Sequence, residues 1–146
     1  MDKSENLLNE IHTFFPTDTR DVRGIAPLKL AYLGDAVFEI LVRTLTVERT
    51  GGPVKKMHSH TSSLVNAKSQ ARLVLAMQDQ LTEEEMAVFH RGRNAKASSV
   101  AKNADIHDYR NATGLEALFG YLYLEGKSAR AVELLKYAAQ SLEIPL

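Results

Sequence analysis

The stretch LKLAYLGDAVFEILV, from Leu28 to Val42, decides how this chain can fold. Apolar side chains occupy most angular positions of a helix over these residues, and a helix that is apolar nearly all round is expected to be buried. Pro27 suits the first turn of such a helix, and Gly51-Gly52-Pro53 would end it near Thr50. The sequence therefore predicts a long, buried helix that begins near residue 27 and ends near residue 50.

Asp35 stands in the middle of this apolar helix. A buried carboxylate without a partner costs several kcal/mol, so it must meet a cation, a metal ion or strong hydrogen-bond donors. A second apolar stretch, LEALFGYLYL from Leu115 to Leu124, repeats the pattern with Glu116 as its one carboxylate. Gly34 and Gly120 would let the two helix backbones approach closely. The two carboxylates could solve this problem together by sharing a hard divalent cation.

Simpler readings of the same residues stay open. Thr113-x-x-Glu116 has the form of a capping box, so Glu116 could close the N-terminus of its own helix. Asp35 could pair with an arginine, and Glu39 could lie on a solvated edge. The glycines would be explained equally well by tight packing without any chemistry.

The rest of the chain also shows helical spacing of apolar residues, and no convincing alternation typical of strands. The fold class is therefore predicted to be all-α, a helical bundle. Besides the helix from Pro27, we expect helices over Ser4–Phe15, residues 54–78 (one or two), Thr82–His90, Thr113–Leu124 and Ser128–Leu142, with a long loop from Arg91 to Tyr109. Apolar stripes are expected at Leu7, Leu8, Ile11 and Phe14, and at Leu64, Ala67, Ala71, Val74 and Leu75.

Length and composition limit the class of protein. The 146 residues are 45% hydrophobic and 25% charged and contain no cysteine, which predicts one domain over residues 1–146 without disulfides or thiolate metal sites. No apolar run reaches the roughly 18 residues of a membrane span, and the polar start MDKSENLLNEI is unlike a signal peptide. A cytoplasmic protein with no membrane partner is expected. A phosphate-binding glycine loop, a G-x-S-x-G elbow and an H-x-x-x-H zinc pair are absent from the sequence.

The net charge of zero hides a basic middle. Residues 49–110 carry 10 Lys and Arg against 6 Asp and Glu, whereas residues 1–48 carry 5 against 8. Such a local basic footprint suits phosphate groups, although a solvated surface with a chance asymmetry would look the same. The candidate RNA-binding residues in it are Lys55, Lys56, Lys68, Arg72, Arg91, Arg93, Lys96 and Lys102.

Two segments resemble a known family. LAYLGDAVFE, residues 30–39, closely resembles the signature helix of the ribonuclease III family, and EALFGYLYLEG, residues 116–126, resembles that family's second conserved segment. With AKSQA at residues 67–71 and RGRNAK at residues 91–96, the chain is similar to members of the family that consist of the catalytic domain alone, without a double-stranded-RNA-binding domain.

The resemblance implies roles for individual residues. Asp35 falls on the family's catalytic aspartate and Glu116 on its metal-binding glutamate, so both are expected to be catalytic and to bind Mg²⁺. Two family acids are replaced, by Ala31 and by Thr113, and Leu28 stands where the family often has another glutamate. These departures fit a site with fewer protein ligands and more water, in an active enzyme. The roles of Glu39 and His107 stay open.

The resemblance also implies an activity. A homodimer would cleave double-stranded RNA and leave short 3′ overhangs with 5′-phosphate ends, with Tyr32 or Phe38 contributing to the dimer contact. The substrate implied is the paired ends of precursor 23S ribosomal RNA, with a ribosomal protein as a further partner. One alternative is an inactive RNA-binding or ribosome-assembly module of the same fold, which the loss of two family acids favours. Another, from composition alone, is an all-α protein-interaction domain.

Overall fold

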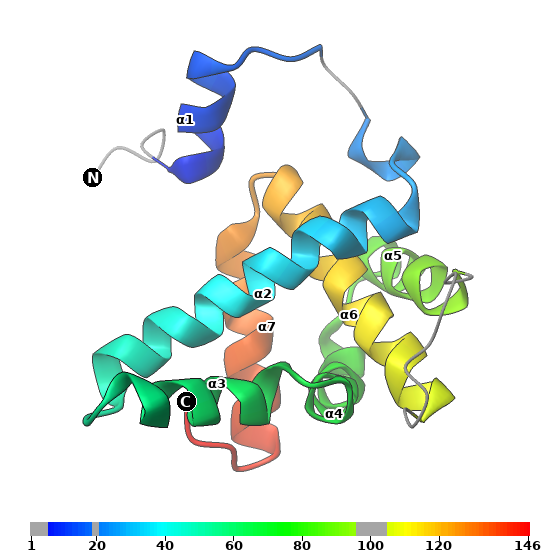
Figure 1. The fold of residues 1–146 in the computed structure, drawn as a ribbon. Helices are drawn as coiled ribbons and strands as arrows, with labels where there is room; N and C mark the ends of the chain where they lie inside the picture. Colours follow the sequence, from blue (N-terminus) through cyan, green and yellow to red (C-terminus); the bar gives the residue numbers. More distant parts are fainter. Residues whose placement is uncertain (1–5, 19–20, 96–104) are drawn as a thin grey trace.

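The computed structural model describes residues 6–18, 21–95 and 105–146, and these residues form helices and turns without a strand (Figure 1). The predicted all-α fold is confirmed. The α-helices are α1 (Leu7–Phe14), α2 (Pro27–Arg49), α3 (Val54–Val65), α4 (Ala67–Met77), α5 (Glu83–Asn94), α6 (Ile106–Leu124) and α7 (Ser128–Ser141), with short 3₁₀ turns η1 (Val22–Gly24) and η2 (Gln78–Gln80). The candidate residues Lys96 and Lys102 lie outside the described residues.

Helix α6 forms the centre of the bundle, and α2, α4, α5 and α7 pack around it (Figure 1). From Ala112 to Leu122 its side chains are buried, apart from the half-buried Glu116. Phe38 of α2 and Phe119 of α6 meet in the core with ring centroids 5.9 Å apart and planes tilted by 53°, a geometry that aromatic pairs prefer. The prediction that the stretch around Glu116 is buried is confirmed.

The backbones of α2 and α6 touch where they cross. A Cβ atom added at Gly34 would lie 1.6 Å from the carbonyl oxygen of Glu116, and one added at Gly120 would lie 2.1 Å from the carbonyl oxygen of Leu30. Side chains at these positions would hold the helices apart, so the crossing requires glycine on both of them. The close approach predicted from the two glycines is confirmed.

Helix α2 begins at Pro27 and ends at Arg49, as predicted, but it is not buried all round. Leu30, Phe38 and Val42 face the core, whereas the opposite side of the helix leaves apolar side chains in solvent. These exposed residues, here called the outward row, are Leu28, Tyr32, Ile40 and Val47. Tyr32 is 85% exposed. In the described parts of the chain, no helix is both long and apolar enough to cross a membrane.

The predicted loop from Arg91 to Tyr109 is wrong at both ends. Helix α5 continues to Asn94 because Gly92 packs against α6, where an added Cβ would lie 2.6 Å from Cβ of Ala117. Helix α6 begins seven residues before the predicted Thr113, because the side chain of Asp105 caps it by accepting hydrogen bonds from the backbone N–H groups of His107 and Asp108.

Two predicted apolar stripes are only partly buried. Leu64, Ala71 and Val74 lie in the core, but Ala67 is half-buried and Leu75 is 50% exposed, because Leu73 and Met77 fill the core on that turn of α4. Helix α1, capped by the side chain of Asn6, buries none of its residues. The predicted helix is confirmed over Leu7–Phe14, but the apolar side of this helix is not buried against the rest of the chain.

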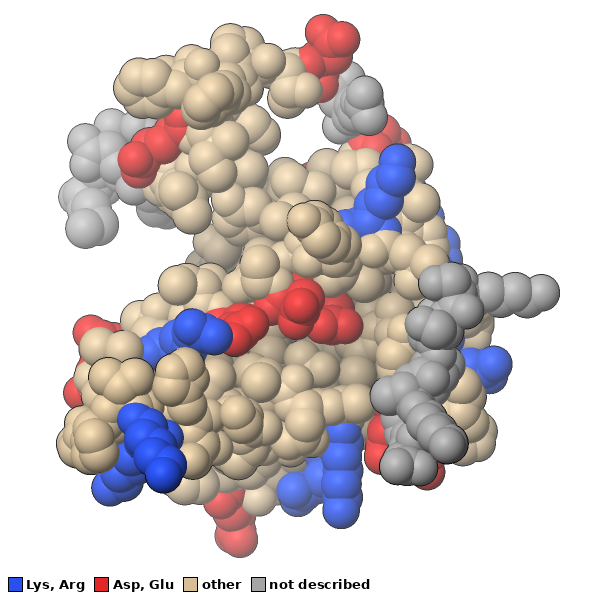
Figure 2. Space-filling model, in the orientation of Figure 1, with Lys and Arg blue, Asp and Glu red and all other residues tan. Residues whose placement is uncertain are grey.

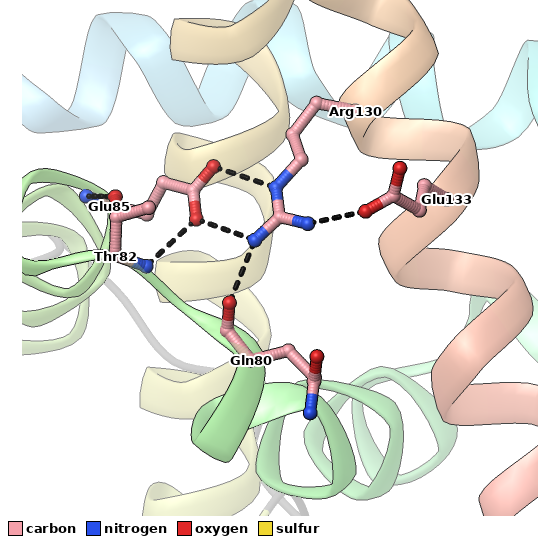
Figure 3. A network of polar contacts seen from close by, with 5 residues as sticks. All are labelled: Gln80, Thr82, Glu85, Arg130 and Glu133. Carbon is pink, nitrogen blue, oxygen red and sulfur yellow. Dashed lines mark hydrogen bonds and ion pairs between the residues drawn. The ribbon is translucent and has the colours of Figure 1, made fainter.

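A network centred on Arg130 joins α5 to α7 (Figure 3). Its guanidinium donates two hydrogen bonds of 3.0 Å to the carboxylate of Glu85, and others to the backbone oxygen of Gln80 and to Glu133. Glu85 also completes the predicted capping box with Thr82. Burial alone would raise the pKa of Glu85, but the hydrogen bonds from Arg130 and the Thr82 backbone outweigh burial and hold this pKa below its ordinary value.

Candidate active site

Asp35 and Glu116 lie together where α2 crosses α6. Gly34 brings the backbone of α2 against the carbonyl group of Glu116. Asp35, the next residue of α2, therefore lies beside Glu116. The two carboxyl groups are close enough to share a hydrogen bond. Asp35 is exposed and Glu116 is half-buried, and Figure 2 shows acidic side chains gathered over the middle of α2. The structure therefore forms one small acidic site from two distant parts of the sequence.

The pKa of Glu116 is raised to about 8. Burial is the largest cause, and the hydrogen bond and negative charge of Asp35 add to it. In the described part of the chain, no Lys, Arg or His forms an ion pair with either carboxylate. The alternative in which an arginine neutralises Asp35 is therefore not what the described residues show. Without a cation, Glu116 keeps its proton at pH values where an ordinary carboxylic acid has lost it.

Glu39, one turn beyond Asp35, forms an ion pair with Arg43, with 2.5 Å between its Oε1 and Nη2 of Arg43. Arg43 is not among the residues predicted from the sequence, although its spacing of four residues from Glu39 is the usual sign of such a pair on a helix. Because Arg43 already neutralises Glu39, the two carboxylates left for a cation are Asp35 and Glu116. Within the described ranges, no group of three or more His, Asp or Glu residues is arranged to hold a metal ion.

Ala31 and Thr113, the residues at the two family acid positions, are both buried. Ala31 is 7% exposed and Thr113 is 8% exposed. The hydroxyl of Thr113 donates a 3.0 Å hydrogen bond to the backbone oxygen of Tyr109, one turn earlier in α6. Thr113 is therefore inside the helix, and the alternative in which it forms an N-terminal capping box with Glu116 is wrong.

Residues 28–127 match the ribonuclease III domain family. The chain belongs to the ribonuclease III family. It is 47% identical over 120 residues to the Mini-ribonuclease 3 of Brevibacillus brevis, covering 82% of this chain and 90% of that protein. It is 45% identical over 118 residues to the Mini-ribonuclease 3 of Clostridium tetani, covering 80% and 78% of the two chains.

A solved structure supports the same fold. A crystal structure of a protein from Fusobacterium nucleatum superposes with a TM-score of 0.75 at 26% identity, and the match covers 84% of this chain and 99% of that one. Family membership makes the chain an endoribonuclease of the ribonuclease III type. Enzymes of this family act on double-stranded RNA and are generally metal-dependent.

The donor set of this ribonuclease III site fits a hard divalent cation. Mg²⁺ prefers oxygen ligands, keeps several waters and is commonly held by one or two carboxylates. Asp35 and Glu116 offer two carboxylates from adjacent helices, and the pKa of Glu116 is raised first by burial and then by the neighbouring Asp35, both of which a bound cation would offset. Asp35, being exposed, is open to solvent and to a phosphate group.

The predicted RNA-binding residues are spread over three helices. On the face drawn in Figure 2, the Lys and Arg side chains lie in separate groups. Lys55 and Lys56 are exposed at the start of α3, and Lys68 and Arg72 are exposed on α4. Arg91 and Arg93 flank Gly92, which packs against α6 at Thr113, Gly114 and Ala117, the last of these next to Glu116 in the sequence. Arg91 also donates a 2.9 Å hydrogen bond to the backbone oxygen of Arg23.

The raised pKa of Glu116 predicts how stability depends on pH when no metal is bound. The unfolded chain loses this proton near the ordinary value of 4.5, whereas the folded chain keeps it up to about 8. The folded state therefore binds more protons between these values, and its stability falls as the pH rises through this window. Glu116→Gln, which cannot ionise, is expected to match the parent near pH 4 and to exceed it at pH 8.5 by on the order of 2 kcal/mol, allowing for partial exposure.

Urea unfolding in the presence of EDTA at the two pH values measures this difference. Glu48→Gln, which removes an exposed carboxylate from the end of the same helix, is the control and should show no such pH-dependent gain. An equal gain for Glu116→Gln at both pH values would contradict the pKa argument.

Proposed function

We propose that the protein is a Mg²⁺-dependent endoribonuclease that cuts both strands of duplex RNA and leaves 5′-phosphate ends. The observation that supports this most directly is the pair of adjacent carboxylates, Asp35 and Glu116, which lie close enough to raise the pKa of Glu116 and have no ion-pair partner among the described residues. Each residue stands on a segment that matches the family's pattern. The exposed position of Asp35 suits it to act as the catalytic carboxylate next to the scissile phosphate.

The residues of the site divide the work by their positions. Asp35 and Glu116 would hold the ion, which when bound supplies an activated water and neutralises charge on the phosphate. Glu116 lies on α6, the central helix, whose neighbouring side chains are buried. Its carboxylate would therefore be held in place more firmly than that of Asp35. The ion pair between Glu39 and Arg43 limits the negative charge facing the RNA backbone. With alanine and threonine at two family acid positions, more of the ion's ligands would be water.

The substrate we propose is a paired segment of precursor 23S ribosomal RNA, cut at its two ends to mature the large-subunit RNA. A-form duplexes hide their base edges, so recognition would depend on phosphates and 2′-hydroxyl groups. The basic residues named above would supply the phosphate contacts. We also propose that residues 1–146 act as one catalytic domain, in the cytoplasm, as a homodimer, and that a ribosomal protein on the precursor particle is a partner.

Cleavage of a long duplex RNA with and without Mg²⁺ tests the proposed activity. Products with 5′-phosphates and short 3′ overhangs, formed only with the ion, are expected, and single-stranded RNA of the same sequence is the control substrate. The inactive RNA-binding alternative, which the absence of two family acids favours, predicts binding without products. A precursor with the paired ends of 23S RNA, compared with an unrelated duplex of equal length, tests the choice of substrate.

The α5 arginines give a separate prediction about RNA affinity. The double variant Arg91→Ala/Arg93→Ala is expected to bind duplex RNA more weakly and to reduce the slope of log K against log salt by about one to two, one per lost phosphate contact. Lys136→Ala, which removes an exposed cation from α7, is the control. Titration of a labelled duplex at several salt concentrations measures the slope, and an unchanged slope would contradict the assignment of α5 to the RNA.

A further inference from the structure

Glu39 and Arg43 continue the side of α2 that carries Asp35. The three residues are spaced four apart in the sequence, so their side chains follow one another along the helix, with neighbouring Cβ atoms about 5–6 Å apart. Figure 2 shows a basic group directly beside the acidic side chains over the middle of α2. Glu39 therefore stands between the carboxylates of the acidic site and the guanidinium of Arg43.

The position of Glu39 would let it bind the same cation as Asp35. Two side chains four residues apart on one helix can hold a single metal ion, as the two histidines of H-E-x-x-H sites do. Yet among the described residues no three acidic or histidine side chains are arranged around one point. The carboxylate of Glu39 is therefore turned toward another partner.

That partner is Arg43. Its Nε and Nη2 both donate hydrogen bonds to Oε1 of Glu39, at 3.0 and 2.5 Å. An acid four residues before a base is the more favourable order for such a pair on a helix, and the planar guanidinium presents its donors in a fixed geometry that a lysine lacks. The pair holds the carboxylate of Glu39 toward the later turn of α2, whereas Asp35 lies on the earlier one.

We propose that Arg43 is a positioning residue that withholds Glu39 from the bound cation and so makes the site selective for Mg²⁺ over Ca²⁺. Mg²⁺ keeps several waters and is commonly held by one or two carboxylates, whereas Ca²⁺ takes about six to eight oxygen ligands and binds more tightly as charged ligands are added. A third carboxylate would therefore favour Ca²⁺ more than Mg²⁺. This inference rests on the proposed cation site of Asp35 and Glu116.

Calorimetric titration of the protein with Mg²⁺ and with Ca²⁺, without RNA and at one pH, tests this role. The side chain of Arg43 is 55% exposed, so Arg43→Gln removes no core contact. This variant frees Glu39 and is expected to lower the preference for Mg²⁺ over Ca²⁺ at least about threefold, mainly through tighter binding of Ca²⁺. Glu39→Gln alone should keep both affinities within about twofold of the parent, because Glu39 is not a ligand while Arg43 holds it.

Three further variants separate the release of Glu39 from a general effect of charge. Lys29→Gln removes an exposed cation of α2 that is nearer to Asp35 along the sequence than Arg43 is, and it should leave the preference unchanged. Arg43→Lys keeps a cation at the same spacing and should restore most of the parental preference. The double variant Glu39→Gln/Arg43→Gln has no carboxylate to release, so it should also keep the parental preference.

The outcomes distinguish this inference from the proposed function. An unchanged preference in Arg43→Gln, or the same loss of preference in the double variant, would overturn the role of Arg43 and leave the cation site of Asp35 and Glu116 standing. Weaker binding of Mg²⁺ by Glu39→Gln would also overturn it, because Glu39 would then be a ligand in the parent. If the parent binds neither ion, the cation site is wrong and the inference with it, while the cleavage assay still decides the enzymatic activity separately.

Discussion

Asp35→Asn is expected to reduce cleavage of duplex RNA by on the order of a thousandfold or more. The amide has the shape of the carboxylate but no charge, so it cannot share a divalent cation with Glu116. Because Asp35 is exposed, the change removes no core contact, and the folded structure should persist. Initial rates of cleavage at saturating Mg²⁺, together with thermal unfolding of the same preparations, measure the two effects.

Loss of the charge at residue 35 has a second expected consequence. The carboxylate of Asp35 is one cause of the raised pKa of Glu116, so Asp35→Asn should lower that pKa and make the metal-free protein at least as stable as the parent at neutral pH. A variant that fails to cleave because it is unfolded would not show this stability. The combination of lost cleavage with retained stability therefore identifies a role in chemistry rather than in folding.

The control for this prediction is Glu48→Gln on the same helix, which should cleave at the parental rate. Binding of duplex RNA is measured in EDTA, where the parent does not cleave. If Asp35→Asn binds the RNA as tightly as the parent, the defect lies in a step after binding. If Asp35→Asn cleaves at a normal rate, Asp35 has no role in catalysis and the proposed mechanism is wrong.

Local signals in the sequence were sufficient for much of the fold and for the proximity of the two carboxylates. Pro27 and the Gly51-Gly52-Pro53 segment delimited α2, and Thr82 with Glu85 marked the start of α5. The two glycines inside apolar helices indicated a close crossing. These features were predictable because a proline, a cap or a missing side chain acts through a few neighbouring residues.

Other features depend on contacts that a sequence pattern does not contain. Residues 91–94 and 106–112 are polar or rich in weak helix formers. They are helical because α5 packs against α6 and because the side chain of Asp105 caps α6. The exposure of Tyr32 was not predictable either. An apolar residue that faces solvent in one chain gives the same pattern as one buried in its core, so periodicity alone could not separate the inner side of α2 from its outward row.

Gly34→Ala is expected to cost about 4 kcal/mol or more, which would leave a domain of this size mostly unfolded or barely stable. The new Cβ would lie 1.6 Å from the carbonyl oxygen of Glu116, 2.5 Å from its carbonyl carbon and 2.8 Å from the backbone nitrogen of Gly120. A side chain in the way could adopt another rotamer, but here the obstacle is the backbone of the central helix. Relief requires α2 and α6 to separate, which opens the core around Phe38 and Phe119.

Gly24→Ala is the control for this prediction, because nothing lies within 4 Å of its added Cβ, and it should change the free energy of unfolding by less than about 1 kcal/mol. Circular dichroism during thermal and urea unfolding measures both variants. Separation of the helices would also move Asp35 away from Glu116, so any folded fraction of Gly34→Ala should bind Mg²⁺ more weakly than the parent. A Gly34→Ala protein with parental stability would mean that the two helices do not cross at Gly34, and the site that depends on this crossing would have to be abandoned with it.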